Sequence, residues 1–95
     1  MTCSEYRFDI KERFIERLSA LTPAVQERVK LKLAEFRMQV NKYGIDPRRH
    51  SNTKYIAFDR VWRLRIGDYR AFFDIEGDLI SFLTIFHRRD AYKRN

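Results

Sequence analysis

Residues 61–75 read VWRLRIGDYRAFFDI, and this stretch decides the fold. Apolar and polar side chains alternate on both sides of the dipeptide Gly67-Asp68, which is the pattern of two half-buried strands joined by a tight turn. A second turn at 76–78 leads into residues 79–86, which are almost wholly apolar. We therefore predict an antiparallel three-stranded meander whose last strand is central, because both of its faces are apolar.

The residues before this meander change from strand to helix periodicity. Alternating apolar positions predict an N-terminal strand over 5–10, and helical spacing of the apolar residues begins at residue 11. Thr22 can cap a second helix and Pro23 suits its first position, whereas Gly44 is suited to end it. The predicted fold is α+β, with an N-terminal strand, a two-helix hairpin and then the meander, the helices packing on one face of the sheet.

Residues 45–59 have the weakest structural pattern. Pro47 and the run RRHSN at 48–52 indicate an exposed loop, and Tyr55, Ile56 and Phe58 are compatible with a short strand.

Length and charge limit the class of protein. The 95 residues are 44% hydrophobic, which fits a single domain over 1–95 with its own core. The formal net charge is +7, and residues 48–95 hold eleven basic against six acidic side chains. Such an excess attracts nucleic acid or an acidic protein segment, although a basic surface can also serve solubility alone.

Several kinds of site and location are not expected. Cys3 is the only cysteine, and no apolar run is long enough to span a membrane or form a signal peptide, so we expect a cytoplasmic protein without membrane contact. His50, His87 and Cys3 are too scattered for a zinc site, and the three glycines form no phosphate-binding loop. We expect neither a bound metal nor a cofactor.

Strand alternation gathers arginines on one face of the predicted sheet. Arg63 and Arg65 share a face, and the simplest register across the turn adds Arg70, away from the helices. Guanidinium groups repel one another unless an anion lies between them, and their geometry matches phosphate. The alternative is an ordinary solvated strand face, with arginines paired to Asp68 or Asp74.

The pattern WRLRIGDYR at 62–70, followed by HRRDAY at 87–92, resembles the RelE/ParE superfamily of bacterial and archaeal type II toxins. The resemblance covers nearly the whole chain and implies a compact ribonuclease-like fold that works without metal. RelE-type members cut mRNA in the ribosomal A site, whereas ParE-type members inhibit DNA gyrase, and a cognate antitoxin wraps and neutralises both. The resemblance thus implies mRNA, the ribosome and an antitoxin as partners, with the toxin and antitoxin forming a hetero-oligomer.

The resemblance also assigns site residues. RelE-type enzymes carry basic residues at the strand positions matched by Arg63 and Arg65. They also carry two arginines matched by Arg70 and Arg88, and a C-terminal tyrosine matched by Tyr92. The strand positions are lysines in the best-known RelE pattern, and an arginine hardly gives up its proton. The identity of the general base is therefore open.

The residues suggest a mechanism in which the ribose 2′-hydroxyl attacks its own 3′-phosphate. The predicted catalytic residues are Arg70, Arg88, Tyr92 and His87. Arg70 and Arg88 would stabilise transition-state charge, and Tyr92 would stack on or orient a base. His87 is the candidate acid or base, because imidazole changes charge near neutral pH. A strand-end histidine bonded to the backbone is the alternative for His87. The predicted RNA-binding residues are Arg63, Arg65, Arg89 and Lys93.

These residues favour an mRNA endoribonuclease toxin that depends on the ribosome. A ParE-like inhibitor of DNA gyrase and a non-catalytic basic nucleic-acid-binding module remain alternatives.

Overall fold

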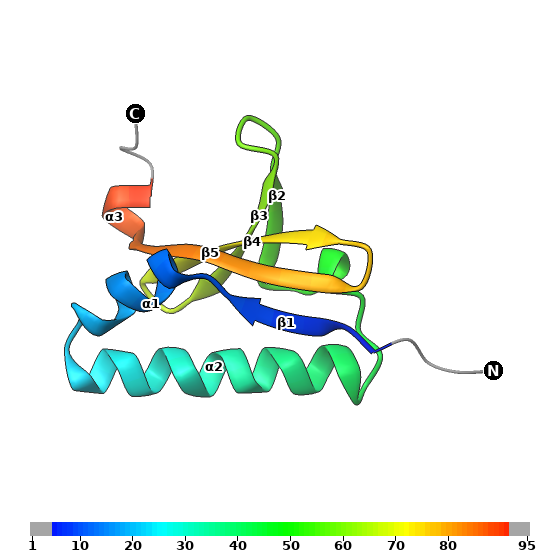
Figure 1. Ribbon diagram of the computed structural model, residues 1–95, viewed down its shortest axis with the longest axis horizontal. Helices are drawn as coiled ribbons and strands as arrows, with labels where there is room; N and C mark the ends of the chain where they lie inside the picture. The colour runs from blue at the N-terminus through cyan, green and yellow to red at the C-terminus, as the bar shows by residue number, and fades with distance from the viewer. Residues whose placement is uncertain (1–4, 92–95) are drawn as a thin grey trace.

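The computed structural model describes residues 5–91, which form an α+β fold built on one five-stranded sheet (Figure 1). The strand order is β1-β5-β4-β3-β2. The elements are, in chain order, β1 (Arg7–Ile10), α1 (Glu12–Ser19), α2 (Pro23–Asn41), the short 3-10 helix η1 (Pro47–Arg49), β2 (Thr53–Ile56), β3 (Val61–Ile66), β4 (Tyr69–Glu76), β5 (Leu79–His87) and α3 (Arg88–Ala91). Among the described residues, no helix is long and apolar enough to cross a membrane.

The sheet is larger and more mixed than predicted. The strands β3, β4 and β5 lie within one residue of their expected bounds, and β5 is an interior strand between β1 and β4. The prediction of a three-stranded meander was incomplete, because β2 adds a fourth antiparallel strand beside β3. β1 pairs in parallel with β5, and α1 and α2 carry the chain from β1 at one edge of the sheet toward β2 at the other.

The long helix α2 lies along one face of the sheet (Figure 1). Its buried apolar side chains belong to the core. It begins where expected, since the Thr22 hydroxyl accepts a bond from the Val25 N–H at 3.4 Å and Pro23 takes the first position. It ends at Asn41, and Gly44 follows with φ of 70°, a left-handed conformation that costs glycine little. The buried core joins both layers: Phe14, Val29, Phe36, Val40, Leu64, Ile66, Ala71, Phe73, Ile80, Phe82 and Ile85.

The position of α1 differs in detail from the prediction that both helices pack on one face of the sheet. This helix contributes Phe14 to the core, but it also runs along the part of β5 that β1 leaves unpaired. The Arg17 Nε donates to the Ile85 carbonyl at 2.6 Å, and its guanidinium lies 4.0 Å from the centre of the Phe86 ring. A polar side chain thus satisfies a backbone acceptor on a strand edge that would otherwise be open.

Candidate functional site

The sheet face opposite α2 holds an open hollow of about 310 Å³ lined by basic and polar side chains. Arg63 and Arg65 come from β3, Arg70 begins β4, and residues 51–54 supply the remaining wall. The hollow lies where strand alternation predicted an arginine face, so the shared position of these three arginines is confirmed.

The strand register places like charges directly opposite each other. Arg65 pairs with Arg70 across the β3–β4 hairpin, and Arg63 pairs with Lys54 across the β2–β3 hairpin. Side chains at opposed antiparallel positions are close neighbours, and like charges there destabilise a sheet. An anion bound between the two arginines would remove this repulsion, and phosphate fits the planar guanidinium groups.

Arg70 is held in place by its own hairpin. Its Nη1 donates to the carbonyl oxygens of Gly67 at 2.9 Å and Tyr69 at 3.0 Å. These bonds fix the guanidinium before any ligand arrives, which lowers the entropy lost on binding.

The acidic residues considered as partners for the strand arginines are engaged elsewhere. The Asp74 carboxylate accepts from the Ile75 N–H at 2.9 Å, and Asp68 lies 3.8 Å from the Nε of Arg88. Within residues 5–91, no carboxylate forms an ion pair with Arg65 or Arg70. The alternative of a solvated strand face whose arginines pair with Asp68 or Asp74 therefore does not apply to Arg65 and Arg70.

The wall formed by residues 51–54 was not predicted from the sequence. Lys54 is exposed on the edge strand β2 and shares the face of Arg63. The sequence was compatible with a short strand that includes Tyr55 and Ile56, and the basic residue beside them in TKYI was the available sign of this position.

His50 anchors this wall to α2. Its ring lies 5.1 Å from that of Phe36, its Nε2 is 2.6 Å from the Gln39 Oε1, and its Nδ1 accepts from the Asn52 N–H at 3.1 Å. The Asn52 carbonyl in turn accepts from the Arg65 N–H at 2.8 Å. Burial lowers the pKa of His50 from its ordinary 6.5, against a weaker opposite effect of the Glu35 carboxylate. The neutral ring therefore links the helix to the hollow.

The structure separates His87 from the arginine hollow. His87 pairs with Tyr69, and the two rings lie 5.2 Å apart, so it shares the face opposite to that of Arg70. Its Nδ1 accepts from the Arg89 N–H at 3.2 Å, which is the backbone-bonded alternative considered for this histidine.

Arg88 lies beside the turn that carries Arg70. Its N–H donates to the Asp68 carbonyl at 2.6 Å, which ties the start of α3 to the Gly67-Asp68 turn. Arg89 is exposed on the same short helix. Tyr92 and Lys93, which the sequence assigned to the site, lie outside the described residues. Residues 5–91 contain no group of three or more His, Cys, Asp or Glu side chains that could hold a metal ion.

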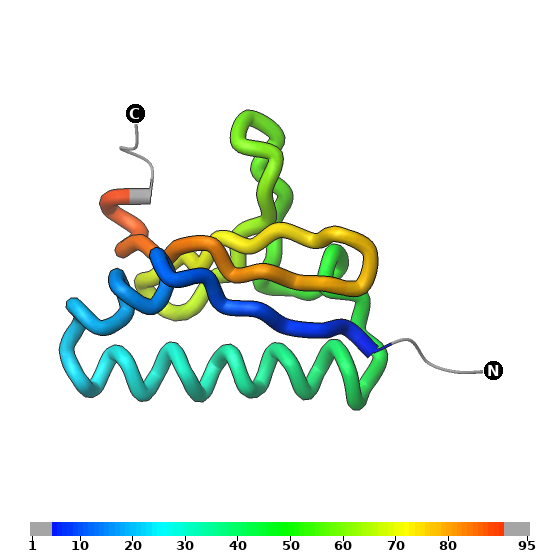
Figure 2. Tube along the Cα trace, viewed as in Figure 1, coloured from blue at the N-terminus to red at the C-terminus, as the bar shows by residue number. Residues whose placement is uncertain are grey.

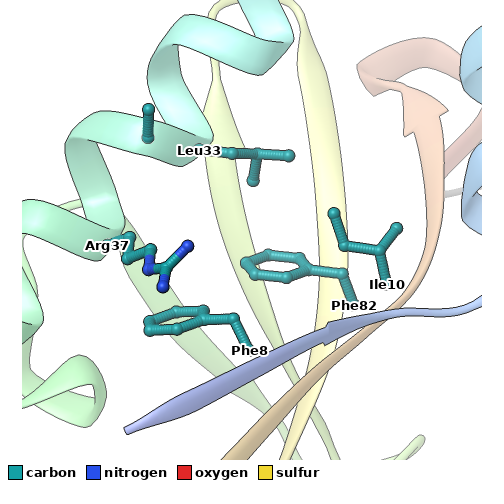
Figure 3. Close-up of a pocket in the computed structure, with 6 residues that line it drawn as sticks. Phe8, Ile10, Leu33, Arg37 and Phe82 are labelled. Atoms are coloured by element: carbon teal, nitrogen blue, oxygen red, sulfur yellow. The ribbon is translucent and has the colours of Figure 1, made fainter. Parts of the chain in front are cut away.

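A second hollow lies between α2 and β1 and is mainly apolar (Figure 3). Phe8, Ile10 and Phe82 form its sheet side, and Leu33 and Ala34 form its helix side. Arg37 reaches over Phe8, with its guanidinium 5.7 Å from the ring centre (Figure 3). We call this second hollow the α2–β1 groove; its lining is mainly apolar, whereas the lining of the arginine hollow is basic and polar.

Comparison with known proteins gives one family match over most of the chain. The model of the family described as the ParE toxin of the type II toxin–antitoxin system parDE matches residues 7–92. Toxin RelE3 of Methanocaldococcus jannaschii is 25% identical over 79 residues, which cover 83% of this chain and 86% of that toxin.

Solved structures of similar fold extend this picture. The RelB–RelE antitoxin–toxin complex from Methanococcus jannaschii contains a chain with a TM-score of 0.65 and 22% identity, covering 90% of this chain and 95% of that one. The isolated RelE toxin of E. coli gives a TM-score of 0.60 at 20% identity, covering 94% and 97%. At this level of identity, the likeness shows a common fold.

Proposed function

The chain belongs to the family of ParE toxins of type II toxin–antitoxin systems, and from this premise we propose that it is a toxin that cleaves mRNA at the arginine hollow. The observation that carries the proposal is the opposed pair Arg65 and Arg70, with Arg63 and Lys54 beside it on the same face. Four cations around one hollow match a nucleic-acid backbone that passes through it.

The proposed reaction needs no group beyond the RNA and the protein. The 2′-oxygen of a ribose bonds to its own 3′-phosphorus, and the bond from that phosphorus to the next 5′-oxygen breaks. A base takes the 2′-proton, and an acid gives a proton to the leaving 5′-oxygen. Negative charge grows on the phosphoryl oxygens, where the guanidinium of Arg70, fixed on its turn, would stabilise it.

The remaining residues take supporting roles in this proposal. Arg63 and Arg65 hold flanking phosphates in the hollow, and Arg88, tied to the Gly67-Asp68 turn, adds positive charge from the side of α3. Tyr92 would orient a base, while Arg89 and Lys93 would extend the contact along the RNA. We keep mRNA within the ribosome as the substrate because of the resemblance to RelE-type toxins.

Proton transfer has two candidates on opposite faces of the sheet. His87 remains the predicted acid or base. For this role, the reacting atoms of the RNA would have to lie at the C-terminal end of β5, next to His87. Lys54 is the one lysine among the described residues that line the hollow, and lysine can serve as a base where arginine cannot.

The proposed partner is a cognate antitoxin, as expected for a toxin of this family and as found in the RelB–RelE complex. The α2–β1 groove offers a docking surface for it, since Ile10 is 42% exposed there and Arg37 offers a positive charge at the rim. An amphipathic segment with apolar side chains and a carboxylate would fit this groove.

Inhibition of DNA gyrase is the second candidate function. The match to the ParE family model favours it, since the family is described by its ParE members. The two functions differ in the molecule that is damaged, so one experiment separates them.

The experiment induces the toxin in growing cells and maps mRNA ends and DNA breaks in the same samples. We expect mRNA cuts at defined positions within codons, reduced about 10²–10³-fold in Arg70→Ala and Arg88→Ala. Arg28→Ala, which removes an exposed arginine from α2, is the matched control and should cut normally. Intact mRNA with gyrase-dependent DNA breaks would establish the second function instead.

A further inference from the structure

The β2–β3 hairpin projects from the sheet (Figures 1 and 2). Its turn, residues 57–60, contains Phe58. Phe58 is 95% exposed, whereas Leu31, another exposed apolar residue, is 67% exposed. The ring of Phe58 is therefore accessible on both faces, and an accessible aromatic ring can stack on a partner.

The backbone at the tip adopts a conformation that glycine normally occupies. Arg60 has φ of 57°, and its N–H donates to the Ala57 carbonyl at 3.3 Å to close the turn. A side chain in this left-handed region is strained, and strain of this kind gathers at functional sites. The turn thus places Arg60 two residues after the exposed Phe58, with Asp59 between them.

The stalk of the hairpin continues the basic face of the hollow. The opposed residues Lys54 and Arg63 line both the hollow and the base of the stalk. On the other face, the rings of Tyr55 and Trp62 lie 5.1 Å apart and brace the two strands against each other. A strand rises about 3.3 Å per residue, so the tip lies roughly 10 Å beyond the Lys54–Arg63 pair.

We infer that this hairpin is a second RNA contact, in which Phe58 stacks on an unpaired base and Arg60 binds a neighbouring phosphate. The inference rests on the proposed RNA-cleaving function, because it needs an RNA strand that crosses the hollow. Lys54 and Arg63 at the base of the stalk and Arg60 in its turn are basic, and they favour a nucleic-acid strand over an apolar protein pocket. Stacking is tolerant of base identity, so the contact adds affinity and direction rather than sequence preference.

The test compares a short and a long single-stranded RNA on the intact protein. Both carry 2′-O-methyl groups, which remove the attacking hydroxyl. The short RNA, of about three nucleotides, fills the hollow alone, and the long RNA, of about eight, reaches past the tip. Binding is measured by calorimetry at low salt, because phosphate contacts weaken steeply as salt rises.

Phe58 variants give the expected pattern. Phe58→Ala should weaken the long RNA about ten-fold and leave the short RNA unchanged, because stacking on one base has this magnitude. Phe58→Trp should bind the long RNA as tightly as the wild type, and Phe58→Leu should behave like Phe58→Ala. Leu31→Ala removes an exposed apolar side chain from α2 and should change neither affinity.

The outcomes separate the two proposals. If Arg65→Ala and Arg70→Ala lose both RNAs while Phe58→Ala binds both normally, the hollow binds RNA and the role of the tip is wrong. If Phe58→Leu binds the long RNA like the wild type, the ring does not act by stacking and the inference is overturned. If the wild type binds the long RNA no more tightly than the short one, the second contact does not exist.

Discussion

Arg65 and Arg70 occupy directly opposed positions, and this pair sets the chemistry of the hollow. In the free protein, the two opposed guanidinium groups lower the free energy of unfolding, since like charges opposite each other destabilise a sheet by about 0.2–1 kcal/mol. That cost is recovered when a phosphate lies between them. In the proposed function, the pair therefore lowers the stability of the free protein and raises its affinity for RNA.

Replacing Arg65 with threonine should consequently stabilise the free protein. Threonine suits a strand and removes the opposed charge, so we expect the free energy of unfolding to rise by up to about 1 kcal/mol at low salt. The gain should shrink as salt screens the remaining charges. Urea unfolding at two salt concentrations measures it, with Arg65→Lys as the control that keeps the charge; a gain independent of salt would contradict this explanation.

Lys54 decides whether the hollow supplies a base as well as positive charge. If it only binds phosphate, Lys54→Arg should cleave like the wild type while Lys54→Ala loses activity. If it takes the 2′-proton, both variants should lose about 10²–10⁴-fold in the rate of the chemical step, because arginine hardly deprotonates. Single-turnover cleavage measures that rate, and equal activity in all three proteins would remove Lys54 from the site.

His50 makes the stability of the hollow depend on pH. Burial lowers the pKa of His50 in the folded protein below its ordinary 6.5, so protons bind preferentially to the unfolded chain. Its contribution to stability is fully present above pH 6.5 and is lost as pH falls through the lowered folded pKa. Protonation of Nδ1 also breaks the bond from the Asn52 N–H, which holds the wall of the hollow.

We expect the melting temperature of the wild type to fall from pH 7.5 to pH 5 more steeply than that of His50→Asn. Asparagine keeps an acceptor for the Asn52 N–H and does not titrate in this range. His87→Asn, which removes the chain's other histidine, is the control and should keep the wild-type slope. Parallel curves for wild type and His50→Asn would show that His50 is not responsible.

Strands with a strong alternation of apolar and polar residues were predicted best from the sequence. The β3 and β4 strands alternate apolar and polar residues around a glycine turn, so both their bounds and the arginine face were predicted. The β2 strand lies at the sheet edge with Lys54 and Tyr55 exposed, so little burial shapes its sequence. Tyr55, Ile56 and Phe58 were compatible with a short strand; the strand includes Tyr55 and Ile56, whereas Phe58 lies in the turn, where exposure places no demand on the hydrophobic pattern.

The β2–β3 turn gives a test in which stability and function oppose each other. Arg60 is left-handed, a conformation that costs a side chain roughly 1–2 kcal/mol and costs glycine little. Arg60→Gly should therefore raise the free energy of unfolding by about 1 kcal/mol while weakening the long RNA. Chemical denaturation and RNA titration measure the two effects, and Arg48→Gly, at an exposed arginine outside this turn, should not stabilise.

In the molecule as a whole, contacts between distant parts of the chain could not be predicted from the sequence. His87 was expected beside the arginines, but its pairing with Tyr69 turns it to the other face of the sheet, and only the register of β4 and β5 fixes that. The link from α2 through His50 to the hollow joins residues whose patterns gave no sign of contact.

The two hollows lie in different places on the molecule, and this constrains how an antitoxin could neutralise it. The arginine hollow is on the face opposite α2, whereas the α2–β1 groove lies between that helix and the edge strand. A partner that filled only the groove would leave the arginines open to RNA. Neutralisation then needs either a segment that continues around the sheet edge or a change in the hollow.

Ala34 on α2 offers a way to remove the groove contact without touching the hollow. It is exposed and lines the groove, and glutamate is a good helix former, so Ala34→Glu should fold normally and can pair with Arg37 three residues on. The new carboxylate fills the groove and repels an acidic segment. We expect the variant to stay toxic, to cut RNA like the wild type, and to escape its antitoxin when both are expressed together.

Ala24→Glu is the control: it places the same charge on α2 away from the groove and should remain neutralised. Full neutralisation of Ala34→Glu would move the antitoxin contact to another surface and leave the arginine hollow as the place where inhibition acts.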